Sequence, residues 1–288
     1  VLARVQEAYE YLPDNALMIR SLGIIAIALC QQMMGNRQQA VAVIKEALSD
    51  PTWPPNLRAR LHFSLAIVLY IDADLPGSMT AAVECLRTIR NLSFVHTRIF
   101  ADYILGAAQY LQNQTEAAKS SLLKVVDDRQ AANPSYVAYA GFILAYIYLQ
   151  HGNEAAADRL LDQIGAYCRD DNKTVLSISQ AFEAEFALRR GDTQKAWHIA
   201  QHADFDVREP MWFLYIPQLT PIKCLLDRGT HDNLQEAHNR LIQLEERMRR
   251  INRESVRIEI LALLALVCHK QRDETAALQN LQTALDLA

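Results

Sequence analysis

The chain has 288 residues, of which 51% are hydrophobic and 22% are charged, and its formal net charge is −4. A mean hydropathy of −0.05 argues against a membrane protein, and the absence of a basic excess argues against direct contact with nucleic acid or an anionic membrane surface. The five cysteines lie far apart without a CxxC pair. This usage is typical of a reducing compartment and predicts a cytoplasmic location.

Apolar residues recur at spacings of three and four along the chain, which predicts helices rather than strands. Polar turns interrupt this pattern repeatedly, and a small residue follows each turn by about five positions. These anchor residues are Ala40, Ala82, Ala118, Ala157, Ala196, Ala237 and Ala277. A period of about 40 residues predicts a helical solenoid, in which each repeat packs only on its neighbours.

Each repeat is expected to contain an A helix and a B helix joined by the polar turn. The A helices are expected near residues 14–33, 56–71, 94–111, 134–150, 174–190, 211–228 and 254–270. The B helices are expected near residues 37–49, 78–91, 115–130, 154–168, 193–204, 233–251 and 274–288. Residues 1–12 fit the B helix of a preceding repeat.

The domain organisation follows from the unbroken repeat pattern. Because no Pro-, Gly- or Ser-rich linker interrupts it, residues 1–288 are expected to form a single domain. The chain starts at Val1 without an initiator Met and ends at Ala288 directly after an apolar helix. We therefore expect a fragment of a longer protein.

Two segments carry a repeat signature of the form G-D-x-x-x-A-x-x-x-L-x-x-A-L-x-L-A. Residues 35–48 match it with Gly35, Ala40, Ile44, Ala47 and Leu48. Residues 272–288 match it with Asp273, Ala277, Leu281, Ala284, Leu285, Leu287 and Ala288, although Arg272 replaces the glycine. The chain thus resembles tetratricopeptide repeat (TPR) proteins, and more closely the repeat region of MalT-like, ATP-dependent LuxR-family transcriptional activators. The resemblance implies an all-α fold, a right-handed TPR-like α-α superhelix of about seven helix-turn-helix repeats.

The sequence contains no common catalytic or cofactor motif. The phosphate-binding loop G-x-x-x-x-G-K-[ST], the nucleophile motif G-x-S-x-G and the zinc motif H-E-x-x-H are all absent from it. His198 and His202 have the spacing of two metal ligands on one helical face, but no third ligand accompanies them. We therefore predict no catalytic residue, no metal site and no cofactor in this segment, and a protein that is not an enzyme.

The resemblance implies that the A helices line the concave groove of the superhelix. Aromatic faces at groove positions stack on sugar rings or apolar ligands, while a few charges fix the orientation of the ligand. The predicted groove residues are Phe63, Tyr70, Phe100, Tyr103, Tyr110, Tyr139, Phe142, Tyr146, Glu185 and Arg189. The alternative is that several of them are core residues between A helices, because aromatic stripes at helical spacing usually are.

Arginines concentrate between residues 245 and 257. Arg247, Arg250 and Arg253 are candidates for docking an acidic partner domain or a nucleotide-bearing neighbour. The alternative is a solvated helix face, because glutamates are interleaved with these arginines.

Two functions of different classes fit the sequence. The resemblance implies a non-catalytic regulatory sensor that binds a small-molecule inducer, such as a sugar, or a regulatory protein. In that family an ATPase module precedes the repeats and a helix-turn-helix domain follows them. The alternative is a free-standing TPR scaffold that binds a peptide or partner protein. At one position where the usual TPR clamp needs Lys or Asn to grip a terminal carboxylate, successive repeats carry Phe63, Tyr103, Phe142 and Ala181, which argues against that clamp.

Overall fold

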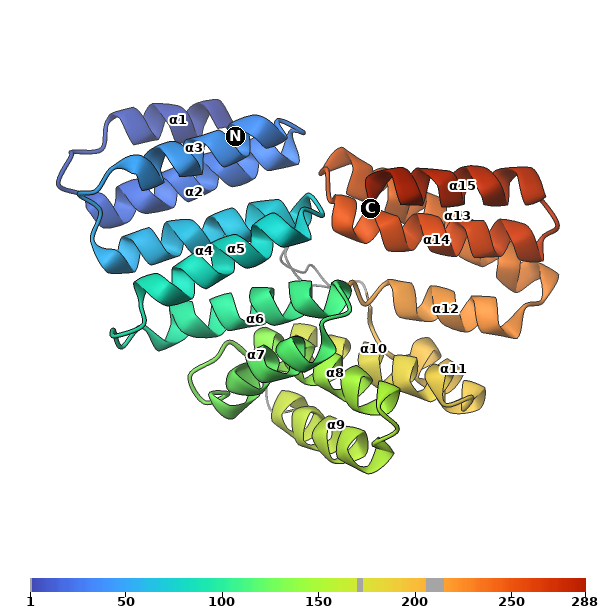
Figure 1. Cartoon of the computed structure of the whole chain (residues 1–288). Helices are drawn as coiled ribbons and strands as arrows, with labels where there is room; N and C mark the ends of the chain where they lie inside the picture. The colour runs from blue at the N-terminus through green and yellow to red at the C-terminus, as the bar shows by residue number, and fades with distance from the viewer. Residues whose placement is uncertain (1, 170–172, 206–214) are drawn as a thin grey trace. The chain divides into compact units, whose positions relative to one another are not determined.

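A computed structural model describes residues 2–169, 173–205 and 215–288 as helices joined by short turns (Figure 1). These residues form fifteen helices and no strand, which confirms the predicted all-α class. The chain divides into two compact units, residues 1–132 with 250–253 and residues 133–249 with 254–288. The single domain over residues 1–288 stays a prediction. No helix in the described ranges is both long and apolar enough to cross a membrane.

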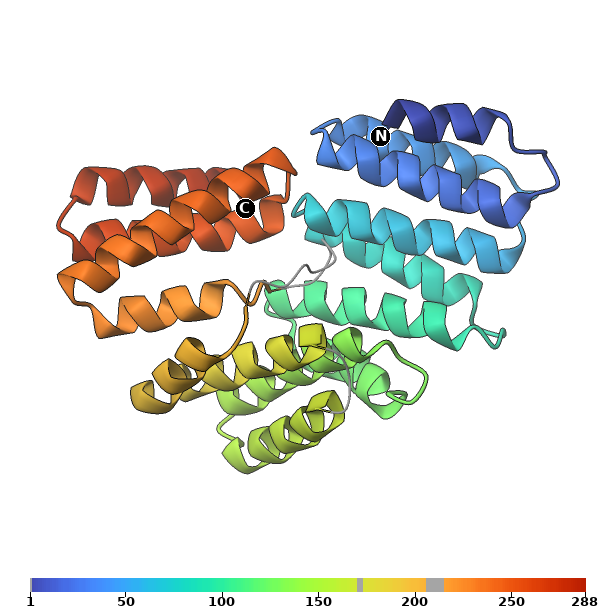
Figure 2. The same cartoon turned by 180° about the vertical axis from the view of Figure 1, so that it is seen from behind.

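Helices alternate between A and B types in both units. The first unit contains α1 (Leu2–Glu10), α2 (Leu17–Met33), α3 (Arg37–Ser49), α4 (Pro55–Ile71), α5 (Leu75–Thr88), α6 (Val95–Leu111) and α7 (Thr115–Asp127). The second contains α8 (Pro134–Gln150), α9 (Glu154–Arg169), α10 (Lys173–Arg189), α11 (Thr193–His202), α12 (Leu219–Arg228), α13 (His231–Arg250), α14 (Glu254–Lys270) and α15 (Glu274–Leu287). Helices of one repeat lie side by side, as the pairs α4–α5 and α14–α15 show in both views (Figure 2).

Most helix boundaries agree with the predicted ranges to within a few residues, and two starts differ for local reasons. Helix α5 begins at Leu75 rather than near residue 78, because the Asp74 carboxylate caps it by accepting a hydrogen bond of 2.9 Å from the Gly77 N–H. Helix α12 begins at Leu219 rather than near residue 211. Residues 211–214 lie outside the described ranges, and Ile216 precedes a proline, which disfavours helical backbone.

The polar turn between A and B helices has the same hydrogen-bond pattern in several repeats. After α10, the Gly191 N–H donates to the Leu188 carbonyl at 3.0 Å and the Asp192 N–H donates to the Ala187 carbonyl at 2.9 Å. Gly191 has a φ of +78°, and Arg272 has a φ of +65° at the matching turn after α14. These are the bonds of a Schellman motif, which needs one left-handed residue and therefore favours glycine.

Small residues lie where the two helices of a repeat approach each other. Six of the seven anchor alanines have no exposed surface, and Ala277 is 8% exposed. A Cβ atom at Gly106 would lie 2.6 Å from Leu122 Cγ, and one at Gly141 would lie 2.5 Å from Ile164 Cγ1. Because both neighbours are buried, these two glycines set how closely α6 approaches α7 and α8 approaches α9.

Replacing Gly141 tests this close approach. Alanine raises helix propensity, but its methyl group would overlap the buried Ile164 side chain, so we expect Gly141→Ala to lower the free energy of unfolding by about 1–3 kcal/mol. Gly165→Ala is the matched control, since its Cβ would lie 3.9 Å from Ser179 Oγ, and we expect it to stabilise the fold by about 1 kcal/mol. Thermal unfolding of both variants measures the two effects, and equal melting temperatures would contradict the packing argument.

Candidate functional site

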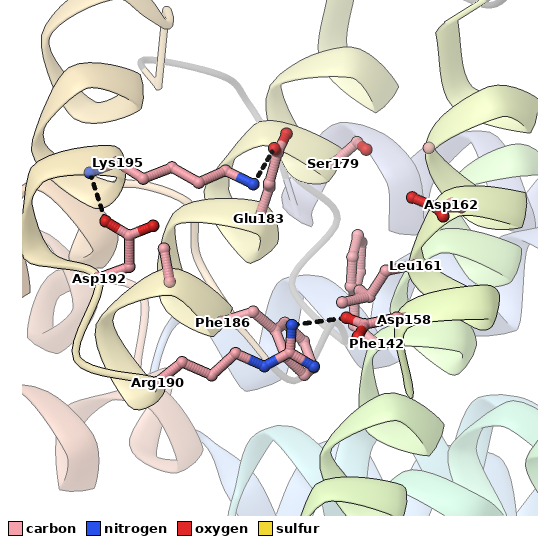
Figure 3. A pocket seen from close by; sticks show the side chains of 12 residues that line it. Phe142, Asp158, Leu161, Asp162, Ser179, Glu183, Phe186, Arg190, Asp192 and Lys195 are labelled. Carbon is pink, nitrogen blue, oxygen red and sulfur yellow. Dashed lines mark hydrogen bonds and ion pairs between the residues drawn. The ribbon is translucent and has the colours of Figure 1, made fainter. Parts of the chain in front are cut away.

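The second unit contains a cavity of about 330 Å³ between α9, α10 and the start of α11 (Figure 3). Phe142 from α8 and Phe186 from α10 contribute its aromatic surface, and each is only 2% exposed. The other side of the cavity carries charged side chains. Its volume lies at the lower end of the range of about 300–1,000 Å³ that ligand sites occupy, and charged side chains make up about half of its lining.

The charged rim of the cavity is held by ion pairs between neighbouring helices. Arg190 Nη1 lies 2.5 Å from Asp158 Oδ1, and Lys195 Nζ lies 3.0 Å from Glu183 Oε1 (Figure 3). Asp162 lines the same cavity and forms no ion pair with any residue that the structure describes. Exposed ion pairs of this kind contribute about 0–1 kcal/mol each, so a bound ligand can replace one of them at low cost.

An aromatic cluster lies behind the cavity wall. The ring of Phe142 stacks on Phe182 with centroids 3.7 Å apart, and Tyr146 stacks on Phe186 at 4.6 Å. The Arg189 guanidinium lies 4.2 Å from the centroid of the Tyr146 ring. Since aromatic contacts of this kind stabilise packing beyond their buried area, the wall of the cavity is held rigidly between α8 and α10.

A buried polar network continues from this cluster toward α14. The Tyr215 hydroxyl donates to Glu185 Oε1 at 2.5 Å, and Thr220 Oγ1 lies 2.8 Å from the same hydroxyl. Lys223 Nζ lies 3.2 Å from Glu185 Oε2 and 2.9 Å from Glu259 Oε1. One ammonium group therefore bridges carboxylates on α10 and α14.

Burial and charge change the acidity of two groups in this network. Burial raises the pKa of Tyr215 well above its ordinary value of 10.0, and the Glu185 and Glu259 carboxylates add to the shift. Burial by itself lowers the pKa of Lys223, but the attraction of Glu259 and Glu185 is larger, so this pKa lies above its ordinary value of 10.5. The folded protein thus favours the protonated form of both side chains.

The structure buries seven of the ten predicted groove side chains, as the core alternative requires. The buried residues, each at most 9% exposed, are Phe63, Tyr70, Tyr103, Tyr139, Phe142, Tyr146 and Glu185. Phe100 and Tyr110 are half-buried, and Arg189 is exposed. Phe142 lines the cavity of Figure 3. A ligand contact by these ten residues stays a prediction.

Several residues of the site were missed from the sequence. Asp158 and Asp162 are on the B helix α9, whereas the predicted groove residues all belong to A helices. Lys223 was missed because its partners are distant in sequence, although Glu185 lies 38 positions before it, about one repeat away. The sequence signal that could have identified this pair is two opposite charges, Glu185 and Lys223, about one repeat apart on A helices that are otherwise apolar.

The three predicted docking arginines differ in exposure. Arg247 and Arg250 are exposed, whereas Arg253 is 3% exposed. The exposed part of this cluster therefore consists of Arg247 and Arg250, and docking of a partner there stays a prediction.

Two buried thiols have low acidity. Burial raises the pKa of Cys85 and that of Cys224 to about 12, so both thiols are protonated. In the part of the chain that the structure describes, no group of three or more His, Cys, Asp or Glu side chains is placed to hold a metal ion.

Removing the bridging ammonium group should destabilise the second unit. In Lys223→Met the Glu185 carboxylate, which is 3% exposed, loses its cation, and we expect the free energy of unfolding to fall by about 3 kcal/mol. Lys195→Met removes an exposed pair, and we expect a change of less than about 1 kcal/mol. Urea unfolding of both variants compares the two, and a Lys223→Met variant as stable as Lys195→Met would contradict the role of the network.

The same network predicts a dependence on alkaline pH. Above pH 10.0, the ordinary pKa of tyrosine, the unfolded chain releases a proton that folded Tyr215 retains, so stability falls as the pH rises. We expect Tyr215→Phe to lose less stability than the wild type between pH of about 8 and about 10.5. Urea unfolding at both pH values gives the change in the free energy of unfolding for each protein. Identical losses in the two proteins would show that Tyr215 titrates as an ordinary tyrosine.

Three similar solved structures share the fold. A Rap protein complexed with competence and sporulation factor matches with 14% identity and a TM-score of 0.66, over 99% of this chain and 78% of that one. The quorum sensor NprR from B. thuringiensis matches with 8% identity and a TM-score of 0.58, over 99% and 91%. A signal transduction ATPase with a TPR sensor from Pyrococcus horikoshii matches with 15% identity and a TM-score of 0.57, over 93% and 42%.

Nearly the whole sequence matches one protein family. No curated protein matches this chain. The family model of the MalT-like TPR region, however, matches residues 2–288. The helical pairs and the shared turn geometry agree with this match. The chain therefore belongs to the family of MalT-like TPR regions.

Proposed function

We propose that this chain is the sensor domain of a LuxR-family transcriptional activator. In this proposal it binds an inducer, such as a sugar, or a regulatory protein, and thereby shifts the equilibrium of an attached ATPase and helix-turn-helix module. A ligand acts on such an equilibrium only through its different affinities for the two states. The match to MalT-like TPR regions over residues 2–288 is the observation that carries the proposal.

The cavity of Figure 3 supports ligand binding by the second unit. Phe142 and Phe186 lie at its base, where each is only 2% exposed, and its rim offers the carboxylates of Glu183 and Asp162. The hydroxyl groups of a sugar or the ammonium group of a peptide bind such exposed carboxylates. Arg189, which the resemblance assigns to the groove, belongs to the same helix α10.

The solved structures support a sensing role by analogy of fold. One of them contains a Rap protein with competence and sporulation factor, another is a quorum sensor, and a third carries a TPR sensor.

The proposal includes a cytoplasmic location, no catalytic activity of this segment, and no direct contact with nucleic acid or a membrane. All five cysteines are free thiols, as a reducing compartment requires. The net charge of −4 supports the exclusion of nucleic acid.

A thermal-shift screen tests whether the cavity is a ligand site. We expect at least one member of a panel of mono- and disaccharides and short peptides to raise the melting temperature of the wild type by about 5 °C at saturating concentration. In a Glu183→Gln/Asp162→Asn variant this shift should fall by at least half, because the two rim carboxylates are neutralised. Both side chains are exposed, so the variant should melt near the wild-type temperature without ligand.

Glu84→Gln is the matched control, because it breaks an ion pair with Arg87 in the first unit and Glu84 does not line the cavity. A shift that is equal in all three proteins would show that the ligand binds elsewhere. A panel in which only peptides bind would favour the free-standing scaffold.

A further inference from the structure

A second cavity, of about 520 Å³, lies among α11, α12 and α13 in the second unit. Its apolar surface comes from Phe205, Pro221, Ile222 and Leu244. The volume is well above that of a single side chain and within the range of about 300–1,000 Å³ that small-molecule sites occupy. This cavity shares no lining residue with the cavity of Figure 3.

The lengths of α12 and α13 explain why space is left here. Helix α12 has 10 residues, whereas the A helices α8, α10 and α14 have 17 residues each and α13 has 20. A short turn joins α12 to α13, so the extra length of α13, about 15 Å, extends beyond the start of α12. The C-terminal end of α13 therefore extends past the start of α12, and four residues of α13 line the cavity beside Pro221 and Ile222 of α12: Arg240, Gln243, Leu244 and Arg247.

These four positions form one face of α13, because they are spaced by three, one and three residues. The two arginines on that face differ in their pairing. Arg240 Nη2 lies 2.5 Å from Glu236 Oε1, one helical turn earlier. Arg247 has Gln243 one turn earlier and Arg250 and Ile251 one turn later.

Arg247 therefore lacks a carboxylate within its own helix, and it forms no ion pair with any residue in the described ranges. Among the described residues that line the cavity, Asp204 is the one acidic side chain, against the two arginines. The described lining thus combines apolar side chains with the unpaired guanidinium group of Arg247, and this group can form a charge-assisted, bidentate bond to a carboxylate.

We propose that this cavity binds a small organic anion that joins a carboxylate to an apolar group. The carboxylate pairs with Arg247, and the apolar group occupies the space beside Phe205, Ile222 and Leu244. The site is separate from the proposed sensor function, which rests on the family match and the cavity of Figure 3.

Isothermal titration with octanoate and octanol tests the proposal, because the two probes share an apolar chain and differ in the carboxylate. We expect wild-type protein to bind octanoate about tenfold more tightly than octanol. Arg247→Met keeps the aliphatic stem and removes the charge, so the two probes should then bind equally.

Arg249→Met is the matched control, because Arg249 is on the same helix, pairs with Glu245 at 3.7 Å and does not line the cavity. It should keep the tenfold preference, and the melting temperatures of both variants should equal that of the wild type. Equal binding of the two probes to the wild type, or a preference that survives Arg247→Met, would overturn the proposal. Binding of an acidic peptide without binding of octanoate would also overturn it, since the cavity would then accept a partner protein.

Discussion

The close approach of the two helices within each repeat is the constraint on which this structure depends. Alanines without exposed surface at the start of six B helices, together with Gly106 and Gly141 on A helices, allow contacts that larger side chains would block. The Schellman turns end the A helices of several repeats with the same pair of hydrogen bonds. Because most repeats share these local features, neighbouring A helices pack in a similar register within each unit, and residues about one repeat apart become neighbours.

This register produces the features of the second unit that matter for function. Phe142 stacks on Phe182, and Lys223 joins Glu185 to Glu259, so contacts between equivalent positions run from α8 through α10 and α12 to α14. They form a rigid support for the cavity of Figure 3, whose rim consists of exposed ion pairs. A ligand site needs both features. The buried, paired side chains hold the helices in place, and the exposed charged side chains of the rim can exchange their ion pairs for contacts with a ligand.

The sequence predicted the helices well, because periodicity and turn residues are local signals. Helix α8 was predicted at residues 134–150 from Pro134 and the turn at Gly152, and the structure has the same bounds. The start of α12 was predicted wrongly, because the apolar pattern continues through Ile216 and Pro217 although a proline there opposes helix formation. The site was harder to predict, since burial of Tyr103 or Glu185 and the pairing of Lys223 depend on which helices pack together, which a single sequence does not specify.

The central claim is that these repeats act as the sensor of a larger regulator, and the coding sequence on either side of this chain tests it most directly. Reading the complete open reading frame should show a nucleotide-binding loop of the form G-x-x-x-x-G-K-[ST] upstream of the repeats and a helix-turn-helix domain downstream of them. A reading frame that encodes neither would contradict the sensor assignment and would leave a free-standing repeat scaffold.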